Sequence, residues 1–160
     1  MTILFVCTGN TCRSPMAEVI LRHKLAHRGL QGIQVASAGI AAEEGFPAHP
    51  LAIGICLEHG VKLNQHRSRQ LTYELIQEAD VVLGMTDSHI HLLSKTYSEK
   101  SADICLLKLY GREDIPSDRE IADPIGMNPA QYQRCFNELE SELERIVQVL
   151  DTQYRKEKMC

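Results

Sequence analysis

The sequence lacks tryptophan, and only 5% of its 160 residues are aromatic, so aromatic-lined recognition surfaces must be sparse. It also lacks an excess of basic side chains, because 17 Lys and Arg stand against 21 Asp and Glu and give a net charge of −4. Such a chain cannot neutralise many phosphates at once, and we expect no nucleic-acid partner and no polybasic membrane contact. A single concentrated pocket for one phosphate remains compatible with this charge.

Hydrophobic runs long enough to cross a membrane are missing as well. No window approaches the roughly 20 apolar residues that a membrane-spanning helix needs. Residues 1–6 show neither the basic region nor the apolar length of a signal peptide. We therefore expect a cytoplasmic protein without a membrane partner. A length of 160 residues suits one domain, and we expect that domain to act as a monomer.

Six cysteines are present, but they form no CxxC pair, and the seven histidines show no ligand spacing relative to them. This pattern argues against a closed zinc site, and we assign no metal and no cofactor. In a reducing compartment the thiols stay free. We expect Cys56, Cys105 and Cys135 to pack as small core hydrophobes, and Cys160 to end a charged tail without a role.

Short apolar runs alternate with helical patterns along the chain. Strands are predicted at residues 3–6, 33–36, 80–84 and 104–107. Helices are predicted from the Ser14-Pro15 pair to near Gly29, at 50–59, after Thr72, at 88–97 and from Asn128-Pro129 to Leu150. This alternation implies right-handed crossovers, and hence one doubly wound α/β domain with a central four-stranded parallel sheet flanked by helices. We place this domain at residues 1–150 and a charged C-terminal tail at 151–160.

Three segments have features of their own. The first helix is predicted to begin with Ser14 as its N-cap and Pro15 at its first helical position. Residues 110–127, with two Pro, two Gly and five acidic residues, form a polar loop of a length that is usually functional or mobile. The acidic residues between Glu113 and Glu120 are most simply its solvated face. The last helix has the clearest apolar face, made of Tyr132, Cys135, Phe136, Leu139, Leu143, Ile146, Val147 and Leu150.

The loop at residues 7–13 connects the first buried strand to the first helix. It lies at the carboxyl end of that strand, where open α/β sheets bind their ligands. A tight loop that leads into a helix N-terminus directs several backbone N–H groups at one spot, and the helix dipole favours an anion there. The loop has neither the Gly-Lys-Ser/Thr of a Walker A motif nor G-x-G-x-x-G. We therefore predict a phosphate-binding loop of a different kind.

Cys7 and Arg13 lie at the two ends of this loop. A helix dipole and a guanidinium both favour a thiolate, and sites of this type lower a Cys pKa from about 8.5 to between about 3.5 and 7.5. Arg13 could bind two phosphoryl oxygens while the sulfur attacks phosphorus in line. The spacing alone would equally suit a core cysteine at a strand end. The preceding strand, the Gly-Asn turn and the Ser-Pro helix start favour the catalytic interpretation.

Residues 5–18, Phe-Val-Cys-Thr-Gly-Asn-Thr-Cys-Arg-Ser-Pro-Met-Ala-Glu, resemble the opening of the low-molecular-weight protein tyrosine phosphatases. Three later motifs lie where that family has its other motifs: Ser37-Ala38-Gly39, His66-Arg67-Ser68-Arg69 and Asp123-Pro124. The resemblance extends from Ile3 to about Leu150. It implies the same α/β fold and a phosphatase that acts on phosphorylated proteins.

The resemblance also implies a role for each site residue. Cys7 would be the nucleophile, and Asp123 the general acid that protonates the leaving group and then activates water. Ser14 would hydrogen-bond the departing thiolate. The substrate phosphate would be bound by Thr8, Gly9, Asn10, Thr11, Cys12 and Arg13, and the loop would be supported by Asn10, Ser37 and His66. Without the resemblance, His66 would be interpreted as a surface-loop histidine and Asp123 as part of a turn.

Two positions depart from the tyrosine-directed pattern of this family. Its tyrosine-specific members usually carry aromatic residues just after Asp-Pro and a larger apolar residue at the position of Thr11. Here Ile125-Gly126 follows Asp123-Pro124, which is similar to the bacterial protein arginine phosphatase branch. We expect hydrolysis of phosphoarginine on proteins through a cysteinyl-phosphate intermediate, with Asp123 also orienting the substrate guanidinium. The alternative is phosphotyrosine.

Two further functions fit the sequence less well. Some arsenate reductases share the Cys-Thr-Gly-Asn loop, but they need a redox cysteine pair after the third strand, and residues 85–93 contain no cysteine. A non-catalytic phosphate-binding module would have lost the nucleophile or the acid, and both are present here. Both alternatives are therefore disfavoured.

Cys12 and the His89-Ile90-His91 segment complete the candidates. The resemblance implies that Cys12 is the redox partner of Cys7, forming a reversible disulfide with it. The alternative is a small packed residue. His89 and His91 are two positions apart on a predicted helix and point in different directions. We expect both to face solvent and to bind no metal.

Overall fold

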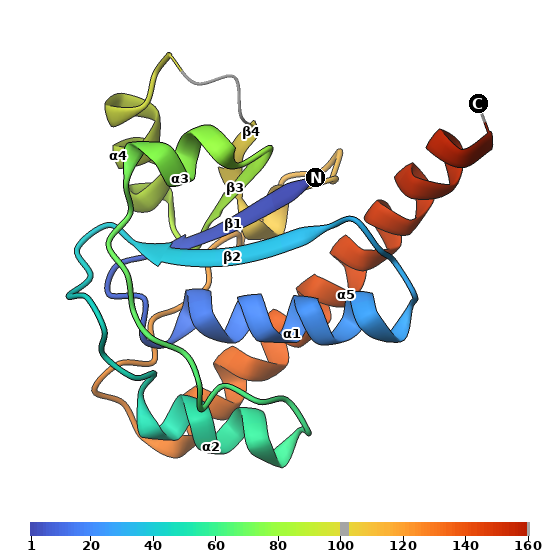
Figure 1. Ribbon diagram of the computed structural model, residues 1–160. Coiled ribbons are helices and arrows are strands. Elements are labelled where there is room, and N and C mark those ends of the chain that lie inside the picture. The colour runs from blue at the N-terminus through green and yellow to red at the C-terminus, as the bar shows by residue number, and fades with distance from the viewer. Residues whose placement is uncertain (100–102, 160) are drawn as a thin grey trace.

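A four-stranded parallel sheet forms the centre of the molecule (Figure 1). The structure, a computed structural model, describes residues 1–99 and 103–159, with side chains as far as Arg155. The strands are β1 (Thr2–Cys7), β2 (Gln34–Gly39), β3 (Val81–Gly84) and β4 (Asp103–Leu106), in the order β2-β1-β3-β4. All neighbouring strands pair in parallel. The predicted single α/β domain is thereby confirmed.

Helices cover both faces of the sheet (Figure 1). One face carries α1 (Arg13–His27), α2 (Pro50–Glu58) and α5 (Pro129–Met159), and the other carries α3 (Tyr73–Glu78) and α4 (Asp87–Thr96). Each face has its own apolar core. Side chains alternate along β1, so that Ile3 and Phe5 enter the larger core while Leu4 and Val6 enter the smaller one. Burial on both faces is what a parallel sheet requires of its strands, and it explains the continuous apolar run of β1.

The last helix, α5, continues beyond the predicted end at Leu150. Its apolar face from Tyr132 to Leu150 is buried, as predicted. The predicted charged tail is helical as far as Met159, because its residues are good helix formers and Asp151 pairs with Arg155 one turn later at 2.9 Å. Cys160 lies outside the described residues. Neither α5 nor any other helix in the described part of the chain is apolar enough over a sufficient length to cross a membrane.

Two element boundaries near the first loop differ from the predicted ones. Helix α1 begins at Arg13, with Cys12 at the N-cap position, so Ser14 is inside the helix and does not cap it. Pro15 is tolerated in this first turn because the N–H groups there have no intrahelical partner. Strand β2 extends to Gly39 and does not end at Ala36, because its last three residues pair with the end of β1. This extension brings Ser37 beside the loop.

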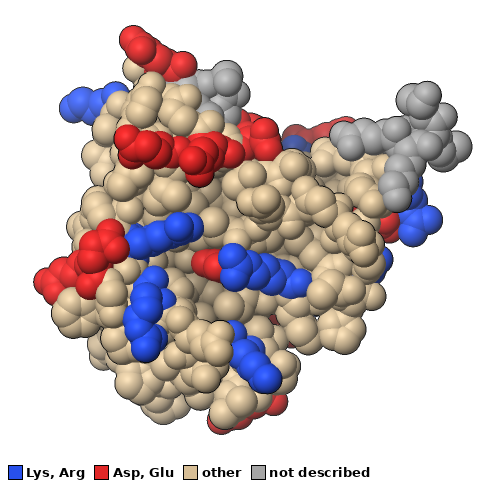
Figure 2. All heavy atoms as spheres, in the orientation of Figure 1, with Lys and Arg blue, Asp and Glu red and all other residues tan. Residues whose placement is uncertain are grey.

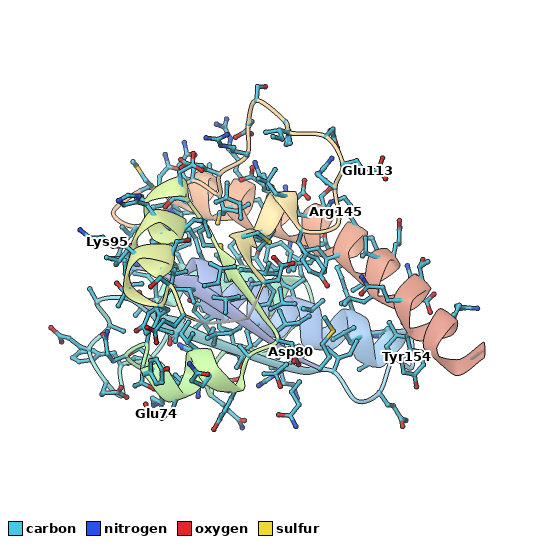
Figure 3. All side chains as sticks on the ribbon, turned by 90° about the horizontal axis from the view of Figure 1, so that it is seen from above. Glu74, Asp80, Lys95, Glu113, Arg145 and Tyr154 are labelled. Atoms are coloured by element: carbon cyan, nitrogen blue, oxygen red, sulfur yellow. The ribbon has the colours of Figure 1, made fainter. Side chains whose placement is uncertain are left out.

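The long loop after β4 is held at its base by charged side chains. After a short 3₁₀ turn, Leu107–Leu109, the buried Lys108 pairs with Glu138 of α5 and with Asp118 of the loop. Arg145 of α5 donates to the carbonyl oxygen of Tyr110 at 2.6 Å, and Figure 3 shows it beside the segment that follows β4. These contacts fix where the loop leaves the core.

The three cysteines predicted to lie in the core do so. Cys56 and Cys135 are buried, and Cys105 is half-buried and packs against the larger core. Burial raises the pKa of each of these thiols to about 12. They are therefore inert packing residues at neutral pH.

Candidate active site

The end of β1 and the start of α1 are joined by residues 8–12 at the carboxyl edge of the sheet. Because β2 and β3 lie on opposite sides of β1, this loop is at the point where the strand order reverses, which is where such sheets bind ligands. The loop borders a cavity of about 180 Å³, the catalytic cavity, lined by Cys7, Thr8, Gly9, Thr11, Cys12, Arg13, Asp123 and Ile125. The structure thus brings together Cys7, Arg13 and Asp123, which are the predicted nucleophile, phosphate-binding arginine and acid.

The backbone N–H groups of this loop are available to bind a ligand. Among the described residues, none of the N–H groups of residues 8–12 donates a hydrogen bond to a protein acceptor. The carbonyl groups, in contrast, are used, since Cys7 and Thr8 accept from Ile40 and Ala41 at 3.0 Å. Consecutive unused N–H groups beside a helix N-terminus form an anion-binding site.

The hydroxyl of Ser14 contacts the sulfur of Cys7. Its Oγ is 2.9 Å from Cys7 Sγ and 3.4 Å from the carbonyl oxygen of Ala38, and it accepts a hydrogen bond from Asn10 Nδ2 at 2.9 Å. A hydroxyl has one proton to donate. With the carbonyl farther away than the sulfur, the geometry directs this proton to Cys7, where it stabilises a thiolate.

Asn10 is fully buried and holds the loop from behind. Its backbone is in the left-handed region at φ 54°, which asparagine tolerates better than most residues. Its Nδ2 also donates to Ser37 Oγ at 2.9 Å, its Oδ1 accepts from the N–H of Arg69 at 3.0 Å, and its carbonyl oxygen accepts from His66 Nε2 at 2.7 Å. The structure thus places Asn10, Ser37 and His66 together. Burial lowers the pKa of His66, and this effect outweighs the hydrogen bond to Asn10, which raises it.

Arg13 and Asp123 line the catalytic cavity and contact each other directly. Arg13 is only 4% exposed, and its guanidinium donates to the carbonyl oxygen of Ile121 at 3.2 Å and to Asp123 Oδ2 at 2.5 Å. Asp123 is 39% exposed, and its Oδ1 accepts from the N–H of Ile125 at 3.1 Å. The buried Ile121 is itself fixed by its N–H, which donates to the carbonyl oxygen of Met85 at 2.8 Å. The long loop therefore holds the carboxylate of Asp123 beside the guanidinium of Arg13.

Comparison with known proteins decides the family. Residues 2–157 match the family model described as low molecular weight phosphotyrosine protein phosphatase. The chain belongs to this family. Its members use a cysteine nucleophile, so the chain is a cysteine-dependent protein phosphatase.

The relatives of this phosphatase include enzymes with two specificities. It is 39% identical to the protein-arginine-phosphatase of Geobacillus stearothermophilus, over 94% of this chain and 97% of the relative. It is 35% identical to EpsP of Ralstonia nicotianae, a probable low molecular weight protein-tyrosine-phosphatase, over 94% of this chain and 91% of that one. The solved structure of the YwlE arginine phosphatase from Geobacillus stearothermophilus superposes with a TM-score of 0.88 at 37% identity, covering 97% of this chain and 96% of that chain.

Gly39 of the phosphatase allows β2 to approach the loop closely. A Cβ at this position would lie 2.5 Å from the carbonyl oxygen of Thr8 and 2.9 Å from the backbone nitrogen of Asn10. Both contacts are with backbone, which cannot move aside without distorting the loop. The glycine of the Ser37-Ala38-Gly39 motif is therefore a steric requirement of this loop, which the sequence alone did not reveal.

His89 is a contact residue of the loop, and the prediction that it faces solvent is wrong. It is 3% exposed, and its Nε2 and Nδ1 lie 3.0 Å from Thr8 Oγ1 and Thr86 Oγ1, respectively. The first turn of α4 follows β3 at the same sheet edge as the loop, and this brings His89 against Thr8. His91 is exposed as predicted. The signal that could have found His89 is its spacing of four from the buried Leu93.

Acidic residues before Asp123 are paired with nearby donors. Asp118 pairs with Lys108, and Glu120 accepts from the N–H of Asp87 at 2.7 Å. Asp118 itself is 84% exposed, in agreement with the predicted solvated face of the loop. In the part of the chain that the structure describes, no three His, Cys, Asp or Glu side chains lie together as they do around a metal ion.

Burial, together with the charge of Arg13 and against the opposing charges of Asp123 and Glu120, lowers the pKa of His89 to about 4. The unfolded chain therefore binds a proton at this residue below about pH 6.5 that the folded chain does not bind above about pH 4. The free energy of unfolding should fall as the pH is lowered through this window, with this residue adding a slope of up to about 1.4 kcal/mol per pH unit.

We predict that His89→Gln removes the part of the pH slope that comes from His89. It should also lower the free energy of unfolding at pH 7 by about 1–3 kcal/mol, since two buried hydrogen bonds are lost. The measurement is urea unfolding at several pH values between 5 and 7.5. His91→Gln, on the same helix but exposed, should behave like the wild type. An identical pH slope in His89→Gln and the wild type would contradict the prediction.

Proposed function

We propose that this phosphatase hydrolyses phosphoarginine on proteins. The observation that carries the proposal is the composition of the catalytic cavity, whose described lining residues include no aromatic side chain. A phenyl ring would find no aromatic wall to stack on. A guanidinium is planar but polar, and it suits a cavity that offers the hydroxyl of Thr11 and the carboxylate of Asp123. The identity of 39% to the Geobacillus arginine phosphatase also supports this specificity.

The first chemical step would transfer the phosphoryl group to Cys7. The loop N–H groups and the guanidinium of Arg13 would bind the phosphoryl oxygens, and the thiolate would attack phosphorus in line as the P–N bond breaks. Asp123 would give its proton to the leaving guanidine nitrogen, so that this nitrogen does not depart as an anion. The contact between Asp123 and Arg13 at 2.5 Å supports this role, because it holds the acid beside the bound phosphate.

The second step would release phosphate. Asp123, now a carboxylate, would take a proton from water as its oxygen attacks phosphorus and the S–P bond breaks. The sulfur would leave as a thiolate, and the hydroxyl of Ser14, 2.9 Å from it, would donate a hydrogen bond to the departing charge. Water supplies the oxygen that phosphate gains, and the enzyme returns to its starting state.

Phosphotyrosine is the second candidate substrate. Its support is the identity of 35% to EpsP, which is named as a probable tyrosine phosphatase. The two substrates would favour different side chains at position 11. A phenol ring would gain from a larger apolar side chain at position 11, whereas a guanidinium would lose its polar neighbour there.

We predict that the wild type has a kcat/KM for a phosphoarginine peptide at least about tenfold above that for the matching phosphotyrosine peptide. Thr11→Ile should shift the ratio toward phosphotyrosine by about tenfold or more, the effect of one apolar group in a specificity pocket. Thr11→Val keeps the size of threonine and isolates the effect of the hydroxyl. Cys7→Ser should abolish both activities. Faster hydrolysis of phosphotyrosine by the wild type would overturn the arginine specificity.

Cys12 is proposed as the redox partner of Cys7. It is buried at the helix start, and its Sγ lies 3.5 Å from the hydroxyl of Tyr132. Burial raises the pKa of Cys12, so it stays a thiol at neutral pH. Peroxide would oxidise the Cys7 thiolate to a sulfenic acid, and the Cys12 thiol would displace water from it to form a disulfide.

We predict that peroxide inactivates the wild type reversibly, with a Cys7–Cys12 disulfide detected by mass spectrometry and activity restored by dithiothreitol. Cys12→Ser should instead be inactivated irreversibly, because Cys7 then proceeds to the sulfinic acid. Cys135→Ser, which removes another buried thiol, serves as the control. A wild-type Cys7 oxidised to sulfinic acid with Cys12 still free would refute the proposal.

A surface hollow next to the catalytic cavity suits a protein substrate. Gly9 and Thr11 line both the catalytic cavity and a neighbouring hollow of about 410 Å³, where Phe46 is 52% exposed. This hollow supports a protein substrate, because it has room for residues that flank the phosphorylated one.

The free thiols of the five described cysteines support a reducing cytoplasm, and the net charge of −4 supports action without a nucleic-acid or membrane partner. We propose that the enzyme acts as a monomer.

A further inference from the structure

A second cavity, of about 420 Å³, lies behind the phosphate-binding loop, where α1, β2 and residues 62–69 meet. We call it the basic cavity, because its lining includes four cationic side chains and one carboxylate. These are Arg22, Lys62, Arg67, Arg69 and Glu18. Figure 2 shows Lys and Arg side chains gathered around a hollow on this face of the molecule. It shares no lining residue with the catalytic cavity.

The positive charges around the basic cavity are mostly unpaired. Glu18 pairs with Arg22 at 2.9 Å. Among the described residues, no carboxylate lies within ion-pair distance of Lys62, Arg67 or Arg69, although the whole chain has a net charge of −4. Cations held close together repel one another unless an anion lies between them. The basic cavity therefore concentrates positive charge that the rest of the chain does not neutralise.

The wall between the two cavities is the hydrogen-bond network of Asn10. Ser37 and His66 line the basic cavity, and both bind Asn10 on their other side, at 2.9 and 2.7 Å. Arg69 joins them, since its N–H donates to Asn10 Oδ1 at 3.0 Å and its Nε donates to the carbonyl oxygen of Ser37 at 2.8 Å. An occupant of the basic cavity would thus contact the groups that hold the loop.

We propose that the basic cavity binds a small polyvalent phosphate anion, such as a diphosphate, and that this occupant is coupled to the phosphate-binding loop through Asn10. Three surplus cations match the charge of such an anion, and the guanidinium groups of Arg67 and Arg69 can each bind two phosphate oxygens. Coupling is reciprocal, so an anion that tightens the network of Asn10 also tightens phosphate binding at the loop. The site does not depend on which phosphorylated residue the enzyme cleaves.

The test titrates the Cys7→Ser protein with inorganic diphosphate at constant ionic strength and follows the backbone amides by NMR. Using a variant without the nucleophile separates this test from the proposed function. We expect two groups of shifts with separate affinities, one at residues 8–13 and one at residues 62–69. Shifts confined to residues 8–13 would overturn the proposal.

A matched pair of substitutions locates the binding charge. Lys62→Gln should weaken the response of residues 62–69 about fivefold and, through the coupling, that of residues 8–13 by a smaller factor. Lys95→Gln removes the same charge from α4, on the other face of the sheet, where Figure 3 shows Lys95, and it should weaken neither response. Equal weakening by both variants would mean that only the overall charge matters, and it would overturn the site.

The coupling has its own readout in the imidazole of His66. An anion beside this ring favours its charged form, so saturating diphosphate should raise the pKa of His66 by about half a unit or more. The groups that face this ring are the carbonyl of Asn10, Glu18, Arg67 and Arg69. A response of residues 62–69 without any change in the pKa of His66 would contradict the coupling to Asn10.

Discussion

Asn10 keeps the phosphate-binding loop in a shape that an isolated peptide would rarely adopt. Its backbone is left-handed, and contacts with Ser14, Ser37, His66 and Arg69 hold it there. A left-handed residue costs about 1–2 kcal/mol, and each buried hydrogen bond contributes about 1 kcal/mol. The network therefore offsets the strain and leaves the loop rigid. With the loop fixed, its unused N–H groups are already in position for a phosphate.

The remaining parts of the active site depend on this fixed loop. The same Asn10 amide that binds Ser37 also binds Ser14, so the proton of Ser14 is left for the sulfur of Cys7. Arg13, at the end of the loop, is oriented by Ile121 and Asp123 from a segment more than a hundred residues away. His89 supports Thr8 from the opposite face of the sheet. Contacts from both faces thus converge on one short loop.

The sequence predicted the features that depend only on a short stretch of residues. The apolar run of β1 and the face of α5 predicted the sheet and the last helix, and the loop after β1 predicted Cys7 and Arg13, whereas Asp123 was predicted only through the family resemblance. The sequence did not predict contacts that exist only in the assembled fold. The last residues of β2 are a strand because β1 is beside them, and His89 is buried because the loop after β1 packs against α4. Helix α5 extends beyond Leu150, its predicted end, because its apolar pattern stops there while residues that favour a helix continue.

We propose that the side-chain hydrogen bonds of Asn10 hold the loop in the shape that catalysis needs. The most direct measurement is kcat for a simple aryl phosphate in Asn10→Gly and Asn10→Ala. Glycine adopts the left-handed backbone without strain but makes no side-chain hydrogen bond, so it separates the conformation from the contacts. We expect kcat to fall at least about tenfold in both variants, a rise of about 1.4 kcal/mol in the barrier. A wild-type kcat in Asn10→Gly would show that the backbone conformation alone is sufficient, and it would contradict the claim.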